Sequence, residues 1–415
     1  MHNRKDNTIH FKRHAEETVK QLSQTFGSVL VTGPVQAGKT TLLKKVAPAA
    51  SYVTLDDPTS LFSAAERDNN FFRDNPPPVF IDKIQYAPSL LDQISDILES
   101  KSQKGLFLLC GSRQLEMNRY SLLTTKKKLA LVHLLGLSLR EKCGIGFSEV
   151  FLPTEDYFVR HRAALLPVSH QNIWKFIHIG SMPSMTGGDS GAWRRFHASY
   201  VKLFIERDVL EFLRLEDSVK FLHFMACAAR RTGQPLNLSS MARECGVSQT
   251  TGKRWIAILE ACHIVYLLKP FCRCCAKRTV KSPKLYYLDT GLAAYLTGWD
   301  SCHELKGGGL ANVFFENFVI TEILKSYYNK GISDPPLYFC RAKGMHEITL
   351  LIEDGRTVYP LVVKWTDAPC RRDISAFSLL DGIPGTRRGN GGIICQHDLL
   401  APLKDNDRII PVSYL

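Results

Sequence analysis

The sequence predicts an α/β protein of several domains, and three observations support this fold class. The chain has 415 residues, and 45% of them are hydrophobic. A domain with a single core usually has about 150 residues, so this length indicates more than one domain. Near the N-terminus a short apolar strand, a glycine-rich loop and a helix follow one another. In the last part, a helical segment precedes several short apolar strands. We expect four regions, with bounds 14–150, 151–225, 226–300 and 301–415.

The first region begins with a helical pattern over 11–27, followed by an apolar strand over 28–32. The string GPVQAGKT then fits the pattern G-x-x-x-x-G-K-[ST] and precedes a helix over 41–46. Backbone N–H groups of such a loop converge on phosphate oxygens, and the helix N-terminus adds its dipole. The pattern predicts binding of ATP with Mg²⁺. The predicted nucleotide-binding residues are Gly33, Pro34, Val35, Gln36, Ala37, Gly38, Lys39, Thr40 and Thr41.

A second apolar strand ends at Asp82, which is expected to hold Mg²⁺ through water together with the hydroxyl of Thr40. The next position is Lys83, where ATPases of this general kind carry the glutamate that activates water. A protonated lysine cannot act as a base, and its charge would oppose metal binding unless the side chain turns away. The sequence therefore predicts nucleotide binding more strongly than turnover, and it leaves open whether Glu66 or another carboxylate replaces the base.

A third strand, GLFLLCGS, ends at Ser112, and Gln114 follows shortly after. These two residues either sense the terminal phosphate or simply cap the strand. The run 126–128 consists of three lysines. One of them reaches a phosphate across a subunit interface of a homo-oligomer, or the run is a solvated charge cluster.

Region 151–225 has a helical pattern and is expected to close over the nucleotide side. Region 226–300 reads as helix, turn, helix and strand pair, with Ser239 or Ser240 capping the first helix and Gly246 in the turn. The strand pair would join HIVYLLKP with KLYYLDT. The chain carries a formal charge of +13, and residues 226–285 hold 11 basic and 2 acidic residues. This excess favours double-stranded DNA as a partner, although the helix pair alternatively only packs against its neighbours. The predicted DNA contacts are Gln249, Thr250, Lys253 and Arg254.

The chain has no apolar stretch long enough for a membrane span of about 18 residues, so we expect no membrane partner. Its 12 cysteines do not form the dense framework of a small secreted domain. A reducing, cytoplasmic setting is therefore expected.

Taken together, these motifs resemble a large family of prokaryotic AAA-type ATPases that join a P-loop domain to a C-terminal domain of unknown function. The resemblance runs from about residue 14 to the end and rests on long strings. Among them are GPVQAGKTTLLKK, PPPVFIDKIQYAP, GLSLRE, KSPKLYYLDTGLAAYLTGW and FFENFVITEILKSYYN. It implies an ATP-binding AAA core, a winged-helix element and a C-terminal fold similar to restriction-type nucleases.

The chain departs from the family pattern at both implied catalytic sites. Relatives carry a glutamate, an aspartate, and a glutamate with a lysine in the nuclease-like domain, and Glu316 and Lys364 match. Thr349 and Val362 stand at the two other acidic positions, so a two-metal site is not expected. On the ATPase side, Lys128 would replace an arginine that serves as a finger, and a lysine stabilises phosphoryl charge less well.

The leading interpretation is an AAA-type protein that binds ATP, hydrolyses it weakly or not at all, and uses the nucleotide to order a DNA- or partner-binding C-terminal region. The alternative is a winged-helix DNA-binding protein whose oligomeric state responds to nucleotide. An active ATPase-coupled nuclease is the third and least supported interpretation.

Overall fold

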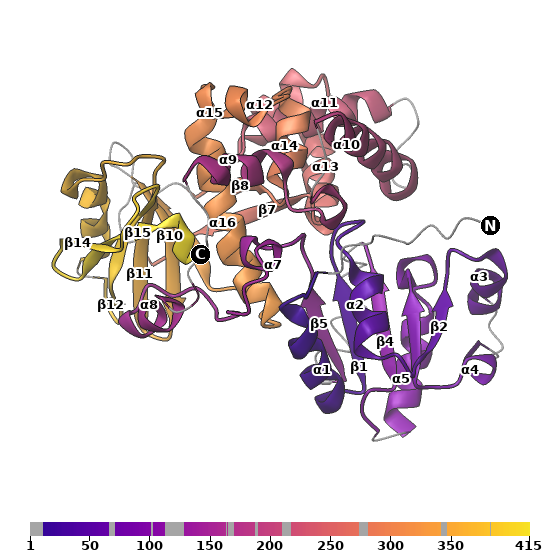
Figure 1. Cartoon of the computed structure of the whole chain (residues 1–415). Coiled ribbons are helices and arrows are strands. Elements are labelled where there is room, and N and C mark those ends of the chain that lie inside the picture. Colours follow the sequence, from indigo (N-terminus) through magenta and orange to yellow (C-terminus); the bar gives the residue numbers. More distant parts are fainter. Residues whose placement is uncertain are drawn as a thin grey trace, which may run out of the picture.

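A computed structural model describes residues 11–65, 71–100, 103–112, 128–162, 164, 170–186, 190–209, 217–273, 281–341, 347–381 and 383–415. The described chain is a mixed α/β structure with two sheets (Figure 1). This confirms the predicted fold class.

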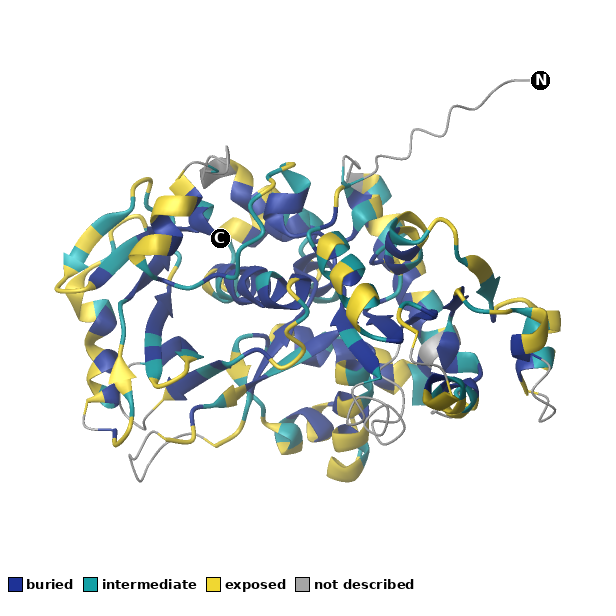
Figure 2. Cartoon of the chain, turned by 90° about the horizontal axis from the view of Figure 1, so that it is seen from below, coloured by how far each residue is buried: buried dark blue, intermediate teal, exposed yellow. Residues whose placement is uncertain are grey.

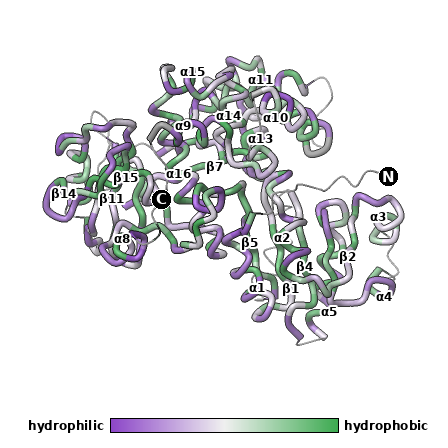
Figure 3. The backbone as a smooth tube through the Cα atoms, viewed as in Figure 1, coloured by the Kyte–Doolittle hydropathy of each residue, from purple (hydrophilic) through white to green (hydrophobic). Residues whose placement is uncertain are grey.

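The N-terminal sheet has five parallel strands in the order β2-β3-β4-β1-β5. The strands are β1 Ser28–Thr32, β2 Ser51–Thr54, β3 Val79–Asp82, β4 Phe107–Gly111 and β5 Leu129–His133. The hydrophobic runs of β1 and β4 have every residue buried, because helices cover both faces of the sheet (Figure 3). The carboxyl ends of parallel strands meet at one edge, so Thr32, Asp82 and Gly111 end their strands side by side.

Two groups of helices cover the N-terminal sheet. On one face, α1 and α2 pack against alternate residues of β1, β3 and β4. On the other face, α3, α4 and α5 pack against the remaining strand residues. The helices are α1 Ala15–Thr25, α2 Lys39–Val46, α3 Pro58–Ala65, α4 Phe71–Asp74 and α5 Leu90–Ser100, with a 3-10 turn Ile84–Tyr86.

A helical group follows along the chain, and most of its members lie at the top of Figure 1, whereas the helices over 139–142 and 155–162 lie lower in that view. It comprises α7 Leu139–Lys142, α8 Glu155–Arg162, α9 His170–Ile179, the 3-10 turn Pro183–Met185, α10 Ser190–Phe204, the π-helical turn Ile205–Val209, α11 Ser218–Arg230, α12 Leu238–Glu244, α13 Gln249–Ala261, α14 Thr290–Thr297 and α15 Cys302–Gly307.

The second sheet has ten strands and crosses the predicted region boundary at residue 300. Its order is β14-β15-β13-β11-β10-β9-β7-β8-β6, with β12 paired to β11. The antiparallel pair β7–β8 confirms the strand pair expected from the sequence. Strand β7 also pairs in parallel with β9, which joins this hairpin to the C-terminal strands. The strands are β6 Gln234–Pro235, β7 Val265–Pro270, β8 Lys284–Tyr287, β9 Leu337–Arg341, β10 Glu347–Asp354, β11 Thr357–Val363, β12 Arg387–Arg388, β13 Gly391–Cys395, β14 Ala401–Lys404 and β15 Asp407–Pro411.

Helix α16, Ala311–Asn329, lies at the centre of the molecule. Fifteen of its 19 residues are buried, which gives it no solvent face of the usual width (Figure 2). It contacts β5 of the N-terminal sheet, β8 and β11 of the second sheet, and α1, α9 and α14. This helix therefore packs against the N-terminal sheet, the helical group and the second sheet.

Candidate functional site

The phosphate-loop motif lies where β1 ends and α2 begins. Gly33 and Gly38 have positive φ angles of 155° and 92°, and Gly38 is the residue before the first turn of α2. A Cβ on Gly33 would lie 2.0 Å from the carbonyl oxygen of Leu134, so only glycine fits there. The Lys39 ammonium is buried and donates to the carbonyl oxygens of Gly33 and Pro34, at 2.9 and 2.8 Å. The loop thus folds around its own lysine.

Asp82 lies beside Thr40, as the predicted metal pair requires. The Thr40 hydroxyl donates to Asp82 Oδ2 at 2.8 Å, and the carboxylate is buried. Two further donors were not predicted: Tyr52 Oη reaches Oδ2 at 3.1 Å, and Cys110 Sγ reaches Oδ1 at 2.7 Å. A hydroxyl and a carboxylate side by side are the hard oxygen ligands that Mg²⁺ prefers, so the residues present fit that ion.

Both new donors stay neutral at pH 7. Burial, and then the Asp82 carboxylate, raises the pKa of Tyr52 to about 12. The same two causes raise the pKa of the Cys110 thiol to about 12. Their register explains the contact, because Asp82 is paired with Cys110 on β4 and with Thr54 on β2, two residues after Tyr52.

Lys83, the residue after Asp82, is paired with a second carboxylate. It adopts a left-handed conformation with φ of 62°, and its ammonium forms an ion pair with Asp56 in the loop after β2. This ion pair offsets the positive charge beside Asp82. On the other side of β3, Gln85 Nε2 donates to Ser112 Oγ at 3.0 Å. Gln114 and Glu66 lie outside the described residues.

A cavity of about 1370 Å³ opens over the loop. One side carries phosphate-loop residues together with Asp82, Lys83 and Ser112. The opposite wall is formed by α10 and the turn before it, with Pro183, Phe196 and Leu203. Part of region 151–225 therefore lines this cavity, whereas α8 contacts the last residues of the chain, where the Tyr157 hydroxyl donates to the Tyr414 carbonyl oxygen at 2.8 Å. The cavity is large enough for a nucleotide, since small-molecule sites usually enclose about 300–1,000 Å³.

Lys128 does not approach this cavity. It immediately precedes β5 at the sheet edge opposite the phosphate loop, and its ammonium pairs with Glu99 at 2.9 Å. Within this chain it therefore contacts no part of the loop. Lys126 and Lys127 lie outside the described residues.

A buried histidine pair that the sequence did not indicate lies behind the loop. His133 Nδ1 is 3.0 Å from Thr32 Oγ1 and 3.2 Å from His263 Nε2. His263, in the turn between α13 and β7, has a φ of 56°. Burial lowers the pKa of His133 to about 4, and burial followed by the charges of His133 and Lys39 lowers that of His263 well below 6.5. The pair joins the last residue of β1 to the helix pair.

The helix pair α12–α13 presents the predicted polar face. Gln249, Thr250, Lys253 and Arg254 are all exposed, whereas Trp255 and Leu259 are fully buried. Gly246 lies between the two helices with a positive φ of 64°, and Ser248 caps α13 by accepting from the Thr251 N–H at 3.0 Å. The expected cap of α12 was wrong. Neither Ser239 nor Ser240 fills it, because the Asn237 side chain precedes the first turn and accepts from the Ser240 N–H at 3.0 Å.

The four positions of the nuclease-like pattern are not brought together by the contacts of the described chain. Glu316 on α16 accepts from Lys284 Nζ and from the Tyr286 hydroxyl, both at 2.7 Å, and Lys284 also binds Glu347. Lys364 instead pairs with Asp373 at 2.6 Å.

The two remaining positions are buried and carry no charge. Thr349 accepts from the Val363 N–H at 3.2 Å, and Val362 packs in the core that includes Phe377. Lys284 therefore bridges the acidic pair Glu316 and Glu347. Among the described residues no group of three or more His, Cys, Asp or Glu side chains is arranged to hold a metal ion.

No helix in the described part of the chain combines the length and the apolar character that crossing a bilayer requires.

Three parts of the chain match known families. Residues 25–143 match the AAA domain, residues 170–303 match a domain of unknown function (DUF8612), and residues 313–415 match a domain of unknown function (DUF4143).

Similar proteins and structures accompany these family matches. Uncharacterized proteins of Mycobacterium bovis and Mycobacterium tuberculosis are each 25% identical over 359 residues, which cover 86% of this chain and 75% of theirs. A Walker-type ATPase of Pyrococcus abyssi is similar with a TM-score of 0.43 and 12% identity, over 70% of this chain and 97% of that one. A signal-transduction ATPase with numerous domains and a tetratricopeptide repeat sensor, from Pyrococcus horikoshii, has a TM-score of 0.27 and 11% identity, over 79% and 48%.

Proposed function

The chain belongs to the AAA-type P-loop ATPases that carry a C-terminal DUF4143 domain, and we propose that it binds ATP with Mg²⁺ but hydrolyses it weakly or not at all. Bound nucleotide then serves to order the C-terminal region. The observation that carries this proposal is the environment of Asp82. Its partner Thr40 is in place for a metal, while the next residue is a lysine held by Asp56.

Different residues of this site would bind the phosphates and the metal ion. Lys39 would neutralise the terminal phosphates, and Thr40 with Asp82 would hold Mg²⁺, which supplies charge neutralisation when bound. Water activation needs a base near the terminal phosphate, and Lys83 with its ammonium paired to Asp56 cannot accept a proton.

The test is an ATP titration with and without Mg²⁺, followed by phosphate release in the same samples. We expect magnesium-dependent binding that Lys39→Ala abolishes, and release far below about one per second, a low rate for an enzyme. The double variant Lys83→Glu with Asp56→Asn should release phosphate about 100-fold faster, because it places a base next to Asp82.

Lys83→Met is the matched control, since it removes the charge without adding a base and should not gain turnover. Ordinary ATPase rates in the unaltered protein would refute the weak-hydrolysis part of the proposal. Failure of that protein to bind ATP would refute the whole proposal.

A second candidate function is DNA binding through α13 as the second helix of a winged helix. It is favoured by the exposed Gln249, Thr250, Lys253 and Arg254 within a strongly basic segment. Arg and Lys side chains on such a helix reach phosphates and base edges in the major groove. Nucleotide would then modulate the oligomeric state of a DNA-binding protein.

This candidate predicts duplex binding that weakens steeply with salt. Lys253→Glu with Arg254→Glu should reduce affinity at least about tenfold, as expected from losing two phosphate contacts. Arg356→Glu with Lys404→Glu changes the net charge equally at two exposed positions, one in the turn between β10 and β11 and one in β14, and is the control. Equal affinities of the two double variants for a duplex would eliminate α13 as the contact surface.

A further inference from the structure

Arg13, just before α1, is a buried cation in the wall of the cavity. Its guanidinium donates to four groups, and the Gly136 carbonyl oxygen at 3.5 Å is the most distant of them. Nη1 reaches the Ala37 carbonyl oxygen at 2.7 Å, Nη2 reaches that of Leu135 at 2.8 Å, and Nε reaches Glu141 Oε1 at 3.1 Å. The planar fork of arginine suits such a divided role, which an ammonium cannot reproduce.

The contact with Ala37 fixes a peptide of the phosphate loop. The carbonyl of Ala37 and the N–H of Gly38 belong to one planar trans peptide, so they point in opposite directions. With its carbonyl held by Arg13, the Gly38 N–H is turned away from Arg13. The N–H groups of this loop are its phosphate donors, and Arg13 therefore sets the direction of one of them.

The contact with Glu141 connects this peptide to the motif GLSLRE. Glu141 is buried and also accepts from the His14 N–H at 2.7 Å and the Ser138 N–H at 2.8 Å. Burial would raise the pKa of Glu141, but Arg13, His14 and these N–H groups together hold it below its ordinary value. The carboxylate is thus ionised at neutral pH and pairs with Arg13 as an anion.

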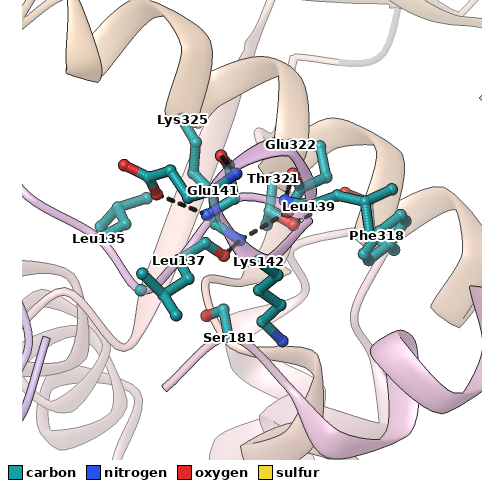
Figure 4. A network of polar contacts seen from close by, with 12 residues as sticks. Leu135, Leu137, Leu139, Glu141, Lys142, Ser181, Phe318, Thr321, Glu322 and Lys325 are labelled. Carbon is teal, nitrogen blue, oxygen red and sulfur yellow. Dashed lines mark hydrogen bonds and ion pairs between the residues drawn. The ribbon is translucent and has the colours of Figure 1, made fainter. Parts of the chain in front are cut away.

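The same motif is bound to α16 (Figure 4) and, through Arg140, to Leu415. The Leu139 N–H donates to Glu322 at 2.7 Å, and Lys325 Nζ donates to the Leu137 carbonyl oxygen at 3.1 Å. Arg140 Nε donates to the Leu415 carbonyl oxygen at 2.8 Å. Buried hydrogen bonds therefore run from Ala37 through Arg13 to Glu141 and the Ser138 N–H, and the backbone on either side of Ser138 is bonded in turn to α16.

We propose that Arg13 is a positioning residue that presets the phosphate loop and couples nucleotide binding to α16 through Glu141. The inference rests on the proposed nucleotide binding. It assigns no chemistry to Arg13 itself, which acts through the Ala37–Gly38 peptide and through α7.

The test compares Mg-ATP binding and amide hydrogen exchange in the full chain. Arg13→Lys should lower ATP affinity about tenfold and Arg13→Met further, since charge-assisted hydrogen bonds are lost. In the unaltered protein, saturating Mg-ATP should slow exchange at the Leu139 amide. That slowing should disappear in Arg13→Lys at saturating ATP. Lys12→Met, an exposed neighbour, is the matched control and should behave as the unaltered chain.

Arg13→Met leaves the buried Glu141 carboxylate without its partner, and this single variant could fail to fold. In that case the double variant Arg13→Met with Glu141→Gln, which removes both charges, is used in its place. The inference is wrong if Arg13→Lys keeps both the affinity and the slowed exchange, while the proposed function then stands. If the unaltered protein binds no Mg-ATP, the proposed function fails, and the inference fails with it.

Discussion

Asp82 accepts hydrogen bonds from Thr40, Tyr52 and Cys110, which lie on three different elements. Among the residues that the structure describes, Oδ1 accepts from Cys110, and Oδ2 accepts from the other two. A cation that binds between Thr40 and Asp82 would replace one bond, while the contacts of Cys110 and Tyr52 keep the carboxylate oriented. Such supporting contacts are what hold a ligand in place for a metal.

The sequence predicted Thr40 and Asp82 because a motif and a strand end mark them. It could not predict Tyr52, Cys110 or Asp56, because their roles depend on the order and register of strands that are distant in sequence. The sequence also left open which group the Lys83 ammonium contacts, and in the structure that group is the Asp56 carboxylate. Arg13 has no local signal at all, since its partners lie 24 to 128 residues away.

The histidine pair predicts how stability depends on pH. An unfolded histidine titrates near pH 6.5, but burial lowers the pKa of His133 to about 4. The unfolded chain therefore binds more protons between these values, so the contribution is full above pH 6.5 and is lost as pH falls toward 4. Between pH 7 and 5 we expect His133 alone to account for a loss of about 2 kcal/mol in the free energy of unfolding.

Urea unfolding of His133→Asn measures this contribution, because asparagine keeps a polar atom near Thr32 but does not titrate. The loss between pH 7 and 5 should shrink by about that amount. His303→Asn, at an exposed position of α15, is the control. An unchanged pH dependence in His133→Asn would show that the pair does not titrate on unfolding.

At the scale of elements, local patterns located most of the helices and strands. The strand over 28–32, the β7–β8 pair and the helical segment over 313–330 that opens the last region were all predicted, because apolar runs and periodicity mark them. The hairpin β14–β15 and the short β12 were not, since they are brief and partly exposed. In particular, β12 lies in a glycine- and arginine-rich stretch that reads as a solvent loop.

The cap of α12 predicts a measurable difference between neighbouring side chains. Asn237→Ala should lower the free energy of unfolding by about 1 kcal/mol, because the Ser240 N–H loses its acceptor. Ser240→Ala keeps that N–H and should change stability by less than about 0.5 kcal/mol. Chemical denaturation followed by circular dichroism compares the two. If Ser240→Ala lowered the free energy of unfolding more than Asn237→Ala does, the Ser240 side chain would be the cap, as expected from the sequence.

At the scale of the molecule, the parallel pairing of β7 with β9 makes one sheet of two predicted regions. Sequence patterns could not show this, because an apolar strand carries no mark of its partner. The helix pair with its exposed basic face is thus attached to the C-terminal strands through β7. It also contacts the N-terminal sheet through His263, which lies beside His133 and Thr32 at the end of β1.

The burial of α16 has a consequence for how the chain is made. The surfaces of β5 and β8 that this helix covers are synthesised before it, and they stay uncovered until residue 329 has left the ribosome. Partly made chains expose such apolar surface to aggregation and to chaperones. A ribosome that stalls before α16 should therefore release a product that is degraded quickly, even though its phosphate loop is already complete.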